Sequence, residues 1–414
     1  MNRKIVKKVF IVICILTLTT KVYTVYADDV DNEEENISNY EDIEDVSTSN
    51  VKENLKINSN RYVVFDRNSK RVLYGKNENV KGAMASTTKI MTSIVVIENA
   101  KLDDIVTISK KASSVGGSRL KLNAGDKVSV KDLLYGLMLR SGNDAAIALA
   151  EHVGGDVNSF IVFMNEKAKK LGLLNTHFVT PHGLDNEEHY TTAVELARIT
   201  DYALENELFR TIVGTNTTDI HINGQTREIR NTNELLGVLD GVVGVKTGFT
   251  NKAGRCLVTE TKRKDMDIIT VVLGANTKKD RTRDSINLIN YTFSKYKMVN
   301  IKELIEEEFN RWNNKNLNSV KVIKGKEENT KIDLGKINLS RMAMKENETD
   351  SLKCEIKVLQ KLDAPIRKEE RVGTLIVKIG DKIIDNIEII NSKNIDKKEW
   401  LDYFKEMIKS LKIM

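Results

Sequence analysis

The chain has 414 residues, 40% of them hydrophobic, which is enough for two or three domains with cores of their own. Basic residues outnumber acidic ones by six, but five of the basic residues lie in the first 27 positions; the remainder is almost neutral, and no nucleic-acid partner is indicated. With two prolines and only two cysteines (Cys256 and Cys354) after that segment, the sequence argues against proline-rich linkers and against a disulfide framework.

The N-terminal segment, residues 1–27, is predicted to be a secretory signal peptide. A basic start precedes a ten-residue apolar run, and Ala27 gives an acceptable cleavage site. A retained membrane anchor is the alternative, but a spanning helix needs roughly 20 apolar residues. Residues 28–54 are expected to be a disordered acidic spacer, because 28–50 holds ten carboxylate side chains and no basic one.

Residues 55–298 have the pattern of an α+β domain. Strand-like segments lie at both ends with helical periodicity between them, which predicts one mostly antiparallel sheet with inserted helices. The expected strands are 62–65, 72–74, 242–245, 256–261 and 268–273; the expected helices begin at Ser86 or span 131–139, 143–152, 158–171, 191–204 and 283–296. The helix that opens at Ser86 is apolar around most of its surface, so we expect it in the centre of the domain.

A second, smaller domain is expected over residues 299–394. Its β-like segments are 319–323, 353–359, 374–379 and 383–390, with charged turns between them. These segments predict a β-rich domain.

The last segment, 395–414, has the pattern of an amphipathic helix. Its apolar residues form one stripe, and lysines occupy much of the remaining surface. The stripe consists of Trp400, Leu401, Tyr403, Phe404, Met407, Ile408, Leu411 and Met414. Because the segment is too charged to span a bilayer, it is predicted to lie on a membrane surface. Packing on the β-rich domain or on a second chain is the alternative.

Three short motifs stand in one order along the chain: Ser86-Thr-Thr-Lys89, Ser141-Gly-Asn143 and Lys246-Thr-Gly248. The first is common on its own, since Ser-x-x-Lys begins at four positions. Only the start at Ser86 combines a helix, a later Ser-x-Asn between helices, and then Lys-Thr-Gly on a strand. Together these residues predict a site for serine acyl transfer.

Ser86 is the expected nucleophile and Lys89 its base. Residues three apart share one face of a helix, so the amine can reach the hydroxyl. A buried lysine beside another cation, such as Lys246, is more easily deprotonated. The alternative is a helix N-cap at Ser86 followed by an exposed lysine. Ser118-Arg-Leu-Lys121 is less suitable, because its neighbours alternate as in a strand and would point serine and lysine to opposite faces.

The second motif supplies polar groups close to the nucleophile. Ser141 is expected to relay a proton between lysine and the leaving group. Asn143 is expected to hold a substrate amide carbonyl, and it can also cap the helix that follows.

The third motif is expected to bind substrate. It follows an apolar strand whose edge can pair with an extended peptide. Thr247 and Lys246 would meet a carboxylate, and Gly248 would let the substrate backbone approach closely. An oxyanion hole needs two donors, for which the backbone N–H groups of Ser86 and Phe249 are the candidates.

These residues resemble the low-molecular-mass penicillin-binding proteins, the serine-type D-alanyl-D-alanine carboxypeptidases. The resemblance is strong over residues 55–297 and looser afterwards. It includes Leu139–Ala145, Glu151–Gly155, Pro181–Asp185, Asn231–Leu236 and Gly241–Gly248. Arg281 stands where this family places an arginine for the substrate's terminal carboxylate, after a strand that can neighbour the Lys-Thr-Gly strand. Phe249 is a departure, because some relatives carry histidine there.

The resemblance implies a β-lactamase/transpeptidase-like fold and removal of the terminal D-Ala from peptidoglycan pentapeptide stems through an acyl-enzyme on Ser86. β-Lactams would acylate the same serine and inhibit the enzyme. No metal and no other cofactor is implied, and the five histidines show no zinc spacing. The implied location is the cell-wall space outside the cytoplasmic membrane, with the terminal helix on the outer membrane surface.

Three other functions fit part of the pattern. A D,D-endopeptidase would differ only in cutting cross-linked peptidoglycan. A class A β-lactamase needs a deacylating glutamate on a loop after Ser-x-Asn, and Glu166 and Glu187 lack that sequence context. A non-catalytic β-lactam-binding sensor would need a spanning helix and a cytoplasmic output segment, which the sequence does not contain.

Overall fold

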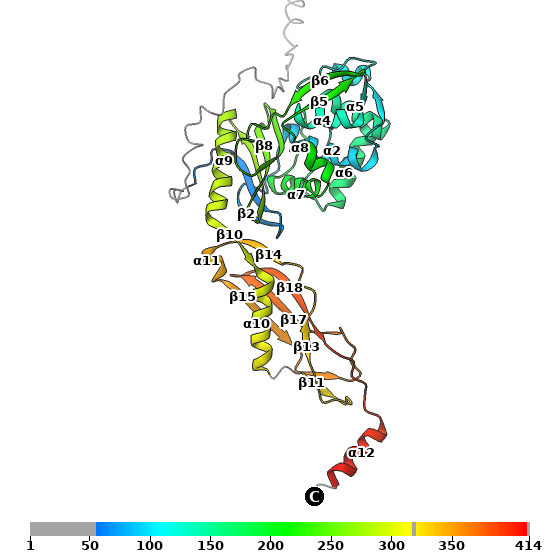
Figure 1. The fold of residues 1–414 in the computed structure, drawn as a ribbon, viewed down its shortest axis with the longest axis vertical. Helices are drawn as coiled ribbons and strands as arrows, with labels where there is room; N and C mark the ends of the chain where they lie inside the picture. The colour runs from blue at the N-terminus through cyan, green and yellow to red at the C-terminus, as the bar shows by residue number, and fades with distance from the viewer. Residues whose placement is uncertain (1–54, 317–319, 412–414) are drawn as a thin grey trace, which may run out of the picture.

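The computed structural model describes residues 55–316 and 320–411, and the chain in it is elongated (Figure 1). Residues 55–295 form a broad head and residues 296–399 form a narrower stalk, with the last helix at the far end of the stalk. The predicted signal peptide and acidic spacer, and the apolar residue Met414, lie outside the described residues.

A five-stranded antiparallel sheet forms the centre of the head, in the order β2-β1-β9-β8-β7. Its strands are β1 (Arg61–Asp66), β2 (Arg71–Lys76), β7 (Val242–Thr250), β8 (Gly254–Arg263) and β9 (Met266–Ala275). Alternate residues of β1 enter different apolar clusters, Val63 on one face and Val64 on the other, as the period of two in a strand requires. The predicted α+β class and the antiparallel sheet are confirmed.

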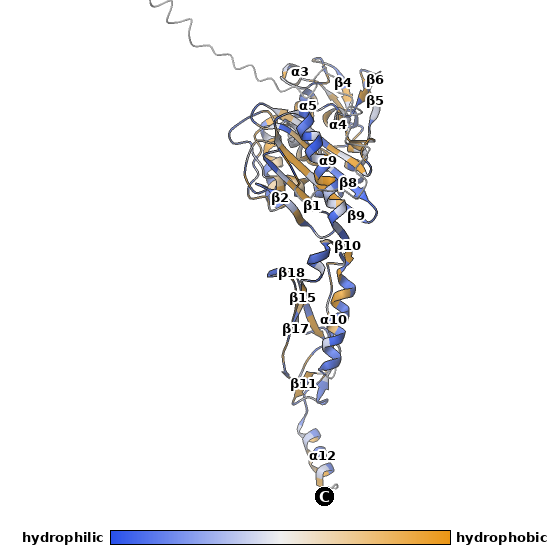
Figure 2. Ribbon diagram, turned by 90° about the vertical axis from the view of Figure 1, so that its left-hand side faces the viewer, coloured by the Kyte–Doolittle hydropathy of each residue, from blue (hydrophilic) through white to orange (hydrophobic). Residues whose placement is uncertain are grey.

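Helices cover both faces of this sheet (Figures 1 and 2). α9 (Lys278–Lys295) packs on β8 and β9 from one side, and α7 contacts β1 and β9 from the other. The remaining inserted elements are α2 (Lys89–Asn99), α3 (Lys110–Ser114), α4 (Val130–Leu139), α5 (Asn143–Gly154), α6 (Val157–Lys170), α7 (Ala193–Leu204) and α8 (Glu207–Val213). α2 is buried from Lys89 to Val96, which confirms its predicted central position.

Two parts of the head differ from the prediction or were not predicted. The sequence pattern predicts no strands in a part of the head that forms a small sheet. This sheet consists of β3 (Ile105–Thr107), β4 (Lys127–Ser129), β5 (Thr217–Ile222) and β6 (Gln225–Arg230). Its hairpin turns at Asn223-Gly224, where both residues have positive φ. The prediction of a strand-like segment at residues 119–122 is wrong. Leu120 and Leu122 are buried, as in the predicted pattern, but the segment is a loop without a strand partner among the described residues.

The stalk holds three sheets and a long helix. Its elements are β10 (Tyr296–Asn300), α10 (Ile301–Lys315), β11 (Val320–Ile323), β12 (Asn329–Thr330), β13 (Ile332–Leu334), β14 (Arg341–Lys345), α11 (Glu346–Thr349), β15 (Leu352–Val358), β16 (Lys361–Asp363), β17 (Arg371–Ile379) and β18 (Lys382–Asn391). The sheet orders are β10-β14, β12-β11-β16 and β13-β18-β17-β15. The four predicted strand regions are present, but α10 was missed: its buried residues are Ile301, Ile305 and Phe309, about one per turn.

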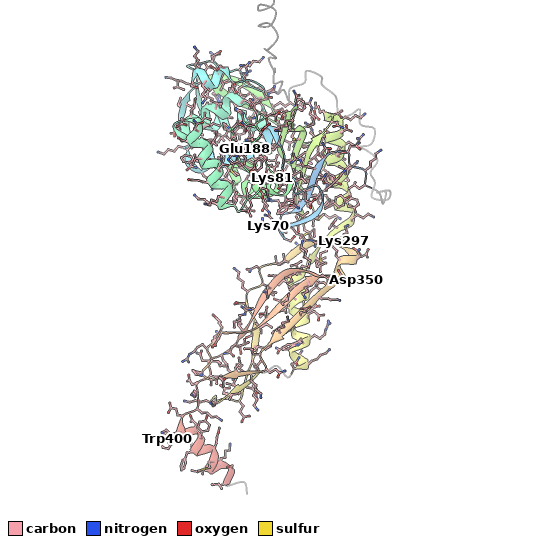
Figure 3. All side chains as sticks on the ribbon, turned by 180° about the vertical axis from the view of Figure 1, so that it is seen from behind. Lys70, Lys81, Glu188, Lys297, Asp350 and Trp400 are labelled. Atoms are coloured by element: carbon pink, nitrogen blue, oxygen red, sulfur yellow. The ribbon has the colours of Figure 1, made fainter. Side chains whose placement is uncertain are left out.

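Specific contacts fix the stalk to the head. The hydroxyl of Tyr296 donates to the carbonyl of Leu73 at 2.7 Å, and the backbone N–H of Ala343 donates to the carboxylate of Asp66 at 3.2 Å. An ion pair between Arg71 and Glu348 adds to this junction. The labels of Lys297 and Asp350 in Figure 3 mark its position.

The terminal helix α12 (Trp400–Leu411) buries none of its residues. Figure 3 shows Trp400 beyond the end of the stalk, and its side chain is 73% exposed. The alternative in which this stripe packs on the β-rich domain is therefore wrong for the described residues. Between residues 55 and 411, leaving aside 317–319, no helix is both long enough and apolar enough to cross a membrane.

Candidate active site

The three motifs meet between the sheet and the inserted helices. Ser86 lies in a 3-10 turn, η2 (Ala85–Thr88), which leads directly into α2 at Lys89. Asn143 is the first residue of α5, and Lys246–Gly248 lie on β7, the strand at the edge of the sheet that packs against η2. The order of motifs in the sequence thus becomes one cluster in space.

Lys89 is the centre of this cluster. Its Nζ lies 2.8 Å from Ser86 Oγ, 2.7 Å from Asn143 Oδ1 and 2.8 Å from the backbone carbonyl of His182. The lysine is fully buried, while Ser86 keeps 9% of its surface exposed. The alternative in which Ser86 caps a helix ahead of an exposed lysine is therefore wrong; the amine is within reach of the hydroxyl proton, as a general base must be.

Asn143 connects the lysine to a neighbouring loop. Its Nδ2 donates to the carbonyl of Gly116 at 2.7 Å, while its Oδ1 faces Lys89. The helix N-cap is Gly142, and no side chain caps this helix, so the capping role suggested for Asn143 is wrong. The next residue, Asp144, accepts the backbone N–H groups of Leu120 and Leu122 at 2.9 and 3.1 Å, which holds the loop against the site.

Ser141 lies in the turn between α4 and α5 with a positive φ of 59°. Its Oγ is buried and has no hydrogen-bond partner among the described residues. A buried hydroxyl without a partner is unusual, and this one keeps both its donor and its acceptor capacity for a proton relay.

At Gly248 the edge strand β7 lies directly against the nucleophile turn. A Cβ at this position would lie 3.1 Å from the backbone nitrogen of Ser86 and 3.2 Å from that of Thr87. Gly248 is predicted to admit the substrate backbone; in the structure, its lack of a side chain leaves room for the backbone of the nucleophile turn. The N–H groups of Ser86 and Phe249 therefore belong to two segments in direct contact, which suits a shared oxyanion hole.

The side chains of β7 have partners on both sides of the motif. Lys246 is buried, and its Nζ donates to the carbonyl of Thr247 at 3.0 Å. The hydroxyl of Thr247 lies 2.8 Å from that of Thr232. The ring of Phe249 stacks under the guanidinium of Arg255 at 3.9 Å, so this departure from the family is packed by a cation on the neighbouring strand.

Arg281 needs a correction. It lies on α9, and β8 separates β9 from β7, so the strand before Arg281 does not neighbour the Lys-Thr-Gly strand. Its guanidinium is 3% exposed and lies 3.4 Å from Glu234. Glu234 is two residues from Thr232, so the segment 232–234 links Arg281 to Thr247 through its side chains. The Nε of Arg281 has no partner among the described residues.

A loop with two buried histidines packs on the nucleophile turn. Burial lowers the pKa of His182 to about 3 and the pKa of His189 to about 4. Both imidazoles are therefore neutral near pH 7. No motif in the sequence indicates a role for His189, because its partner Thr88 lies 101 residues away.

The site can be compared with that of a class A β-lactamase, which needs a deacylating glutamate. Glu166 and Glu187, the two glutamates considered for a β-lactamase, are exposed. Lys89, by contrast, is fully buried and contacts the carbonyl of His182. Neither of the two glutamates therefore shares the buried position of the serine and the lysine, which does not favour the β-lactamase alternative.

Comparison with known families agrees with this geometry. A family model described as D-alanyl-D-alanine carboxypeptidase matches residues 47–277, and one described as the penicillin-binding protein 5 C-terminal domain matches residues 312–397. D-alanyl-D-alanine carboxypeptidase DacF of Bacillus subtilis is 34% identical over 83% of this chain and 87% of its own length. DacC of Escherichia coli is 33% identical over 82% and 85%.

Solved structures show the same likeness over both parts of the chain. Penicillin-binding protein 5 from Haemophilus influenzae superposes with a TM-score of 0.67 at 27% identity, covering 83% of this chain and 98% of its own. DacD from Francisella tularensis gives 0.63 at 29% identity, with 83% and 95% covered. The chain therefore belongs to the D-alanyl-D-alanine carboxypeptidase family and is a serine hydrolase of that family.

Proposed function

We propose that this protein removes the terminal D-Ala from peptidoglycan pentapeptide stems through an acyl-enzyme on Ser86. The observation that carries the proposal is the position of Lys89 Nζ, 2.8 Å from Ser86 Oγ and 2.7 Å from Asn143 Oδ1. A serine hydroxyl is a weak nucleophile and needs such an adjacent base.

In the acylation step, Ser86 Oγ attacks the carbonyl carbon of the penultimate D-Ala, and its proton passes to the neutral amine of Lys89. The positive charge of Lys246 favours that neutral amine. The N–H groups of Ser86 and Phe249 bind the oxyanion. When the C–N bond breaks, the proton moves from Lys89 through the hydroxyl of Ser141 to the amine of the departing D-Ala.

In the deacylation step, water attacks the ester while Lys89 takes its proton. Collapse of the intermediate releases the shortened stem and returns the proton to Ser86 Oγ. A β-lactam follows the first half of this route, because opening of its ring acylates the same oxygen. Its leaving nitrogen stays tethered to the acyl group, and the adduct inhibits the enzyme.

The substrate's terminal carboxylate is assigned to Thr247, Lys246 and Arg281, with Gly248 leaving space along β7. Arg281 is supported by its link to Thr247 through the segment 232–234 and by its Nε, which has no partner in the described chain. Asn143 orients the amide that precedes the scissile bond.

We also propose where the enzyme works. Residues 1–27 direct secretion and 28–54 form a spacer, so that the catalytic domain (55–298) and the β-rich domain (299–394) stand in the cell-wall space. The exposed apolar stripe of α12, in the predicted helical segment 395–414, rests on the outer face of the cytoplasmic membrane. A fully buried large apolar side chain contributes roughly 1.5–3 kcal/mol. Half of this value for each of several residues is enough for binding to the membrane, and lysines add attraction to anionic lipid.

Three substrates test the reaction: a free pentapeptide stem, the same stem with an amidated C-terminus, and a cross-linked dimer, with products identified by mass. Release of D-Ala from the free acid, in preference to the other two, is expected. Faster cleavage of the dimer would make the protein an endopeptidase, and absence of all cleavage would contradict the proposal.

The carboxylate role of Arg281 has its own variant. A hydrogen bond to a charged group contributes about 1.5–3 kcal/mol, so Arg281→Ala should lower kcat/KM for the free acid about 10- to 150-fold. Arg283→Ala, on the same helix but 39% exposed, is the control. Equal cleavage of the amidated and free stems by the wild-type enzyme would show that the role is wrong.

A further inference from the structure

A chain of hydrogen bonds runs from the histidine loop to the nucleophile turn. The backbone N–H of Val179 donates to His189 Nδ1 at 2.9 Å. Since Nδ1 accepts, the proton of the neutral imidazole is on Nε2, which therefore donates to Thr88 Oγ1 at 2.8 Å. The Thr88 hydroxyl is left with one proton, and it donates this to the carbonyl of Ala85 at 2.8 Å.

The carbonyl of Ala85 and the N–H of Ser86 belong to one peptide group. In a trans peptide the C=O and N–H bonds point in opposite directions, so their dipoles are aligned, and a donor at the carbonyl oxygen polarises the N–H at the opposite end. All donors in the chain point the same way, from Val179 toward Ser86. Hydrogen bonds aligned in this manner strengthen one another.

The chain is shielded from water. Thr88 is 1% exposed and His189 is 3% exposed. Gly183, with a φ of +90°, brings its backbone so close that a Cβ would lie 2.0 Å from the Ala85 carbonyl oxygen. Hydrogen bonds are electrostatically stronger in such a low-dielectric environment.

The same contacts hold an unfavourable backbone conformation. Ala85 has a φ of +49°, a left-handed region that is unfavourable for a residue with a Cβ. The turn needs tertiary contacts to keep this geometry, and the hydroxyl of Thr88 binds the carbonyl of that residue.

We propose that Thr88 and His189 are positioning residues that orient and polarise the Ala85–Ser86 peptide, and so strengthen the Ser86 N–H as an oxyanion donor. The inference rests on the proposed oxyanion role of that N–H. It assigns a function in catalysis to a histidine that touches neither the nucleophile nor its base in the contacts described above.

The size of the effect follows from two known quantities. One oxyanion-hole donor contributes about 10²–10³-fold to rate, and alignment strengthens a hydrogen bond by about 10–30%. Losing 10% of two powers of ten, or 30% of three, corresponds to a loss of about 1.6- to 8-fold in the acylation rate when the chain is interrupted. This is much less than the loss of the donor itself.

Two pairs of variants test the inference. Thr88→Val removes the hydroxyl and Thr88→Ser keeps it; His189→Met removes the donor and His189→Gln places an amide N–H near the position of Nε2. Each is acylated by benzylpenicillin labelled with ¹³C at the β-lactam carbonyl. The rate of acylation and the infrared stretching frequency of the ester carbonyl are measured in each acyl-enzyme.

We expect the Val and Met variants to react about 1.6- to 8-fold more slowly than Ser and Gln, with a higher carbonyl frequency, because a weaker oxyanion hole polarises the ester less. Equal carbonyl frequencies within both pairs would overturn the inference. This holds even if the acylation rates fall, because a lower rate with an unchanged frequency indicates a purely structural role. Labelling that persists in Ser86→Ala would instead overturn the proposed nucleophile. The two failures are therefore distinguishable, and the two pairs are independent if one variant does not fold.

Discussion

The carboxylate of Asp144 is predicted to stabilise the head by several kcal/mol, and Asp144→Ala measures this. The residue is fully buried and directly follows Asn143. Its oxygens accept three backbone N–H groups, those of Leu120, Leu122 and Ala145, at 2.9, 3.1 and 3.0 Å.

The magnitude follows from what the loop can do once the carboxylate is gone. Hydrogen bonds to a charged group contribute about 1.5–3 kcal/mol each, but the freed N–H groups can reach water if the loop opens. Opening would expose Leu120 and Leu122, which are 2% and 3% exposed. Both unpaired N–H groups in a closed loop and exposed leucines in an open one are unfavourable. We therefore expect the free energy of unfolding to fall by about 3–5 kcal/mol from a total of about 5–15 kcal/mol.

Urea unfolding followed by circular dichroism is the assay. Asp144→Asn should lie between wild type and Asp144→Ala, because its amide oxygen still accepts while its NH₂ faces a backbone donor. Asp219→Asn, at an exposed position, is the control. Since Asn143 donates to the carbonyls of Gly116 and Ser118 in the same loop, penicillin acylation should also slow in Asp144→Ala. A loss of less than about 0.5 kcal/mol would refute the reasoning.

Gly248→Ala is expected to slow penicillin acylation by about 10- to 100-fold, because the new Cβ would lie 3.1 Å from the nitrogen of Ser86; an unchanged rate would contradict this. Burial lowers the pKa of His182 to about 3 and of His189 to about 4, so between those values and about 6.5 only the unfolded chain is protonated at these sites. The free energy of unfolding therefore falls as the pH falls through that window, by up to about 1.4 kcal/mol per pH unit for each histidine. Urea unfolding at several pH values should show that the free energy of unfolding of His189→Gln depends less steeply on pH than that of wild type. Equal dependence on pH would count against this reasoning. The mature chain should pellet with anionic vesicles and a chain ending at Asn394 should not, because α12 exposes its apolar stripe; equal sedimentation would return the helix to a protein contact.

The reacting groups could be predicted because chemistry restricts the residue types and the helix fixes their spacing. Ser86 and Lys89 are three residues apart, and the amine does reach the hydroxyl. Asn143 could be connected to them only through the order of the motifs, and its contact with Lys89 depends on how α5 packs on α2. The strands of the head were predictable because they are apolar and lie at both ends of the domain.

The supporting residues could not be predicted, because their partners are distant in sequence. His189 is 101 residues from Thr88, and Asp144 accepts N–H groups from a loop more than 20 residues earlier. The alternation of Leu120 and Leu122 reports their burial correctly, but a loop bound to a carboxylate gives the same pattern as a strand.

Two further differences have simple physical reasons. α10 buries only Ile301, Ile305 and Phe309 along a charged surface, so its apolar signal is weak. The side chain of Arg281 comes from α9 and not from a strand beside β7; its place could be expected from a resemblance, but its route to the site depends on sheet order, which local sequence does not encode.

The most direct test of the account is the location of the penicillin adduct. After incubation with benzylpenicillin and digestion with trypsin, mass spectrometry should find one adduct on the peptide 82–89, which contains Ser86 and ends at Lys89, and none in Ser86→Ala. An adduct on the peptide 112–119, which contains Ser118, or an adduct that persists in Ser86→Ala, would contradict the central claim that Ser86 is the acylated nucleophile.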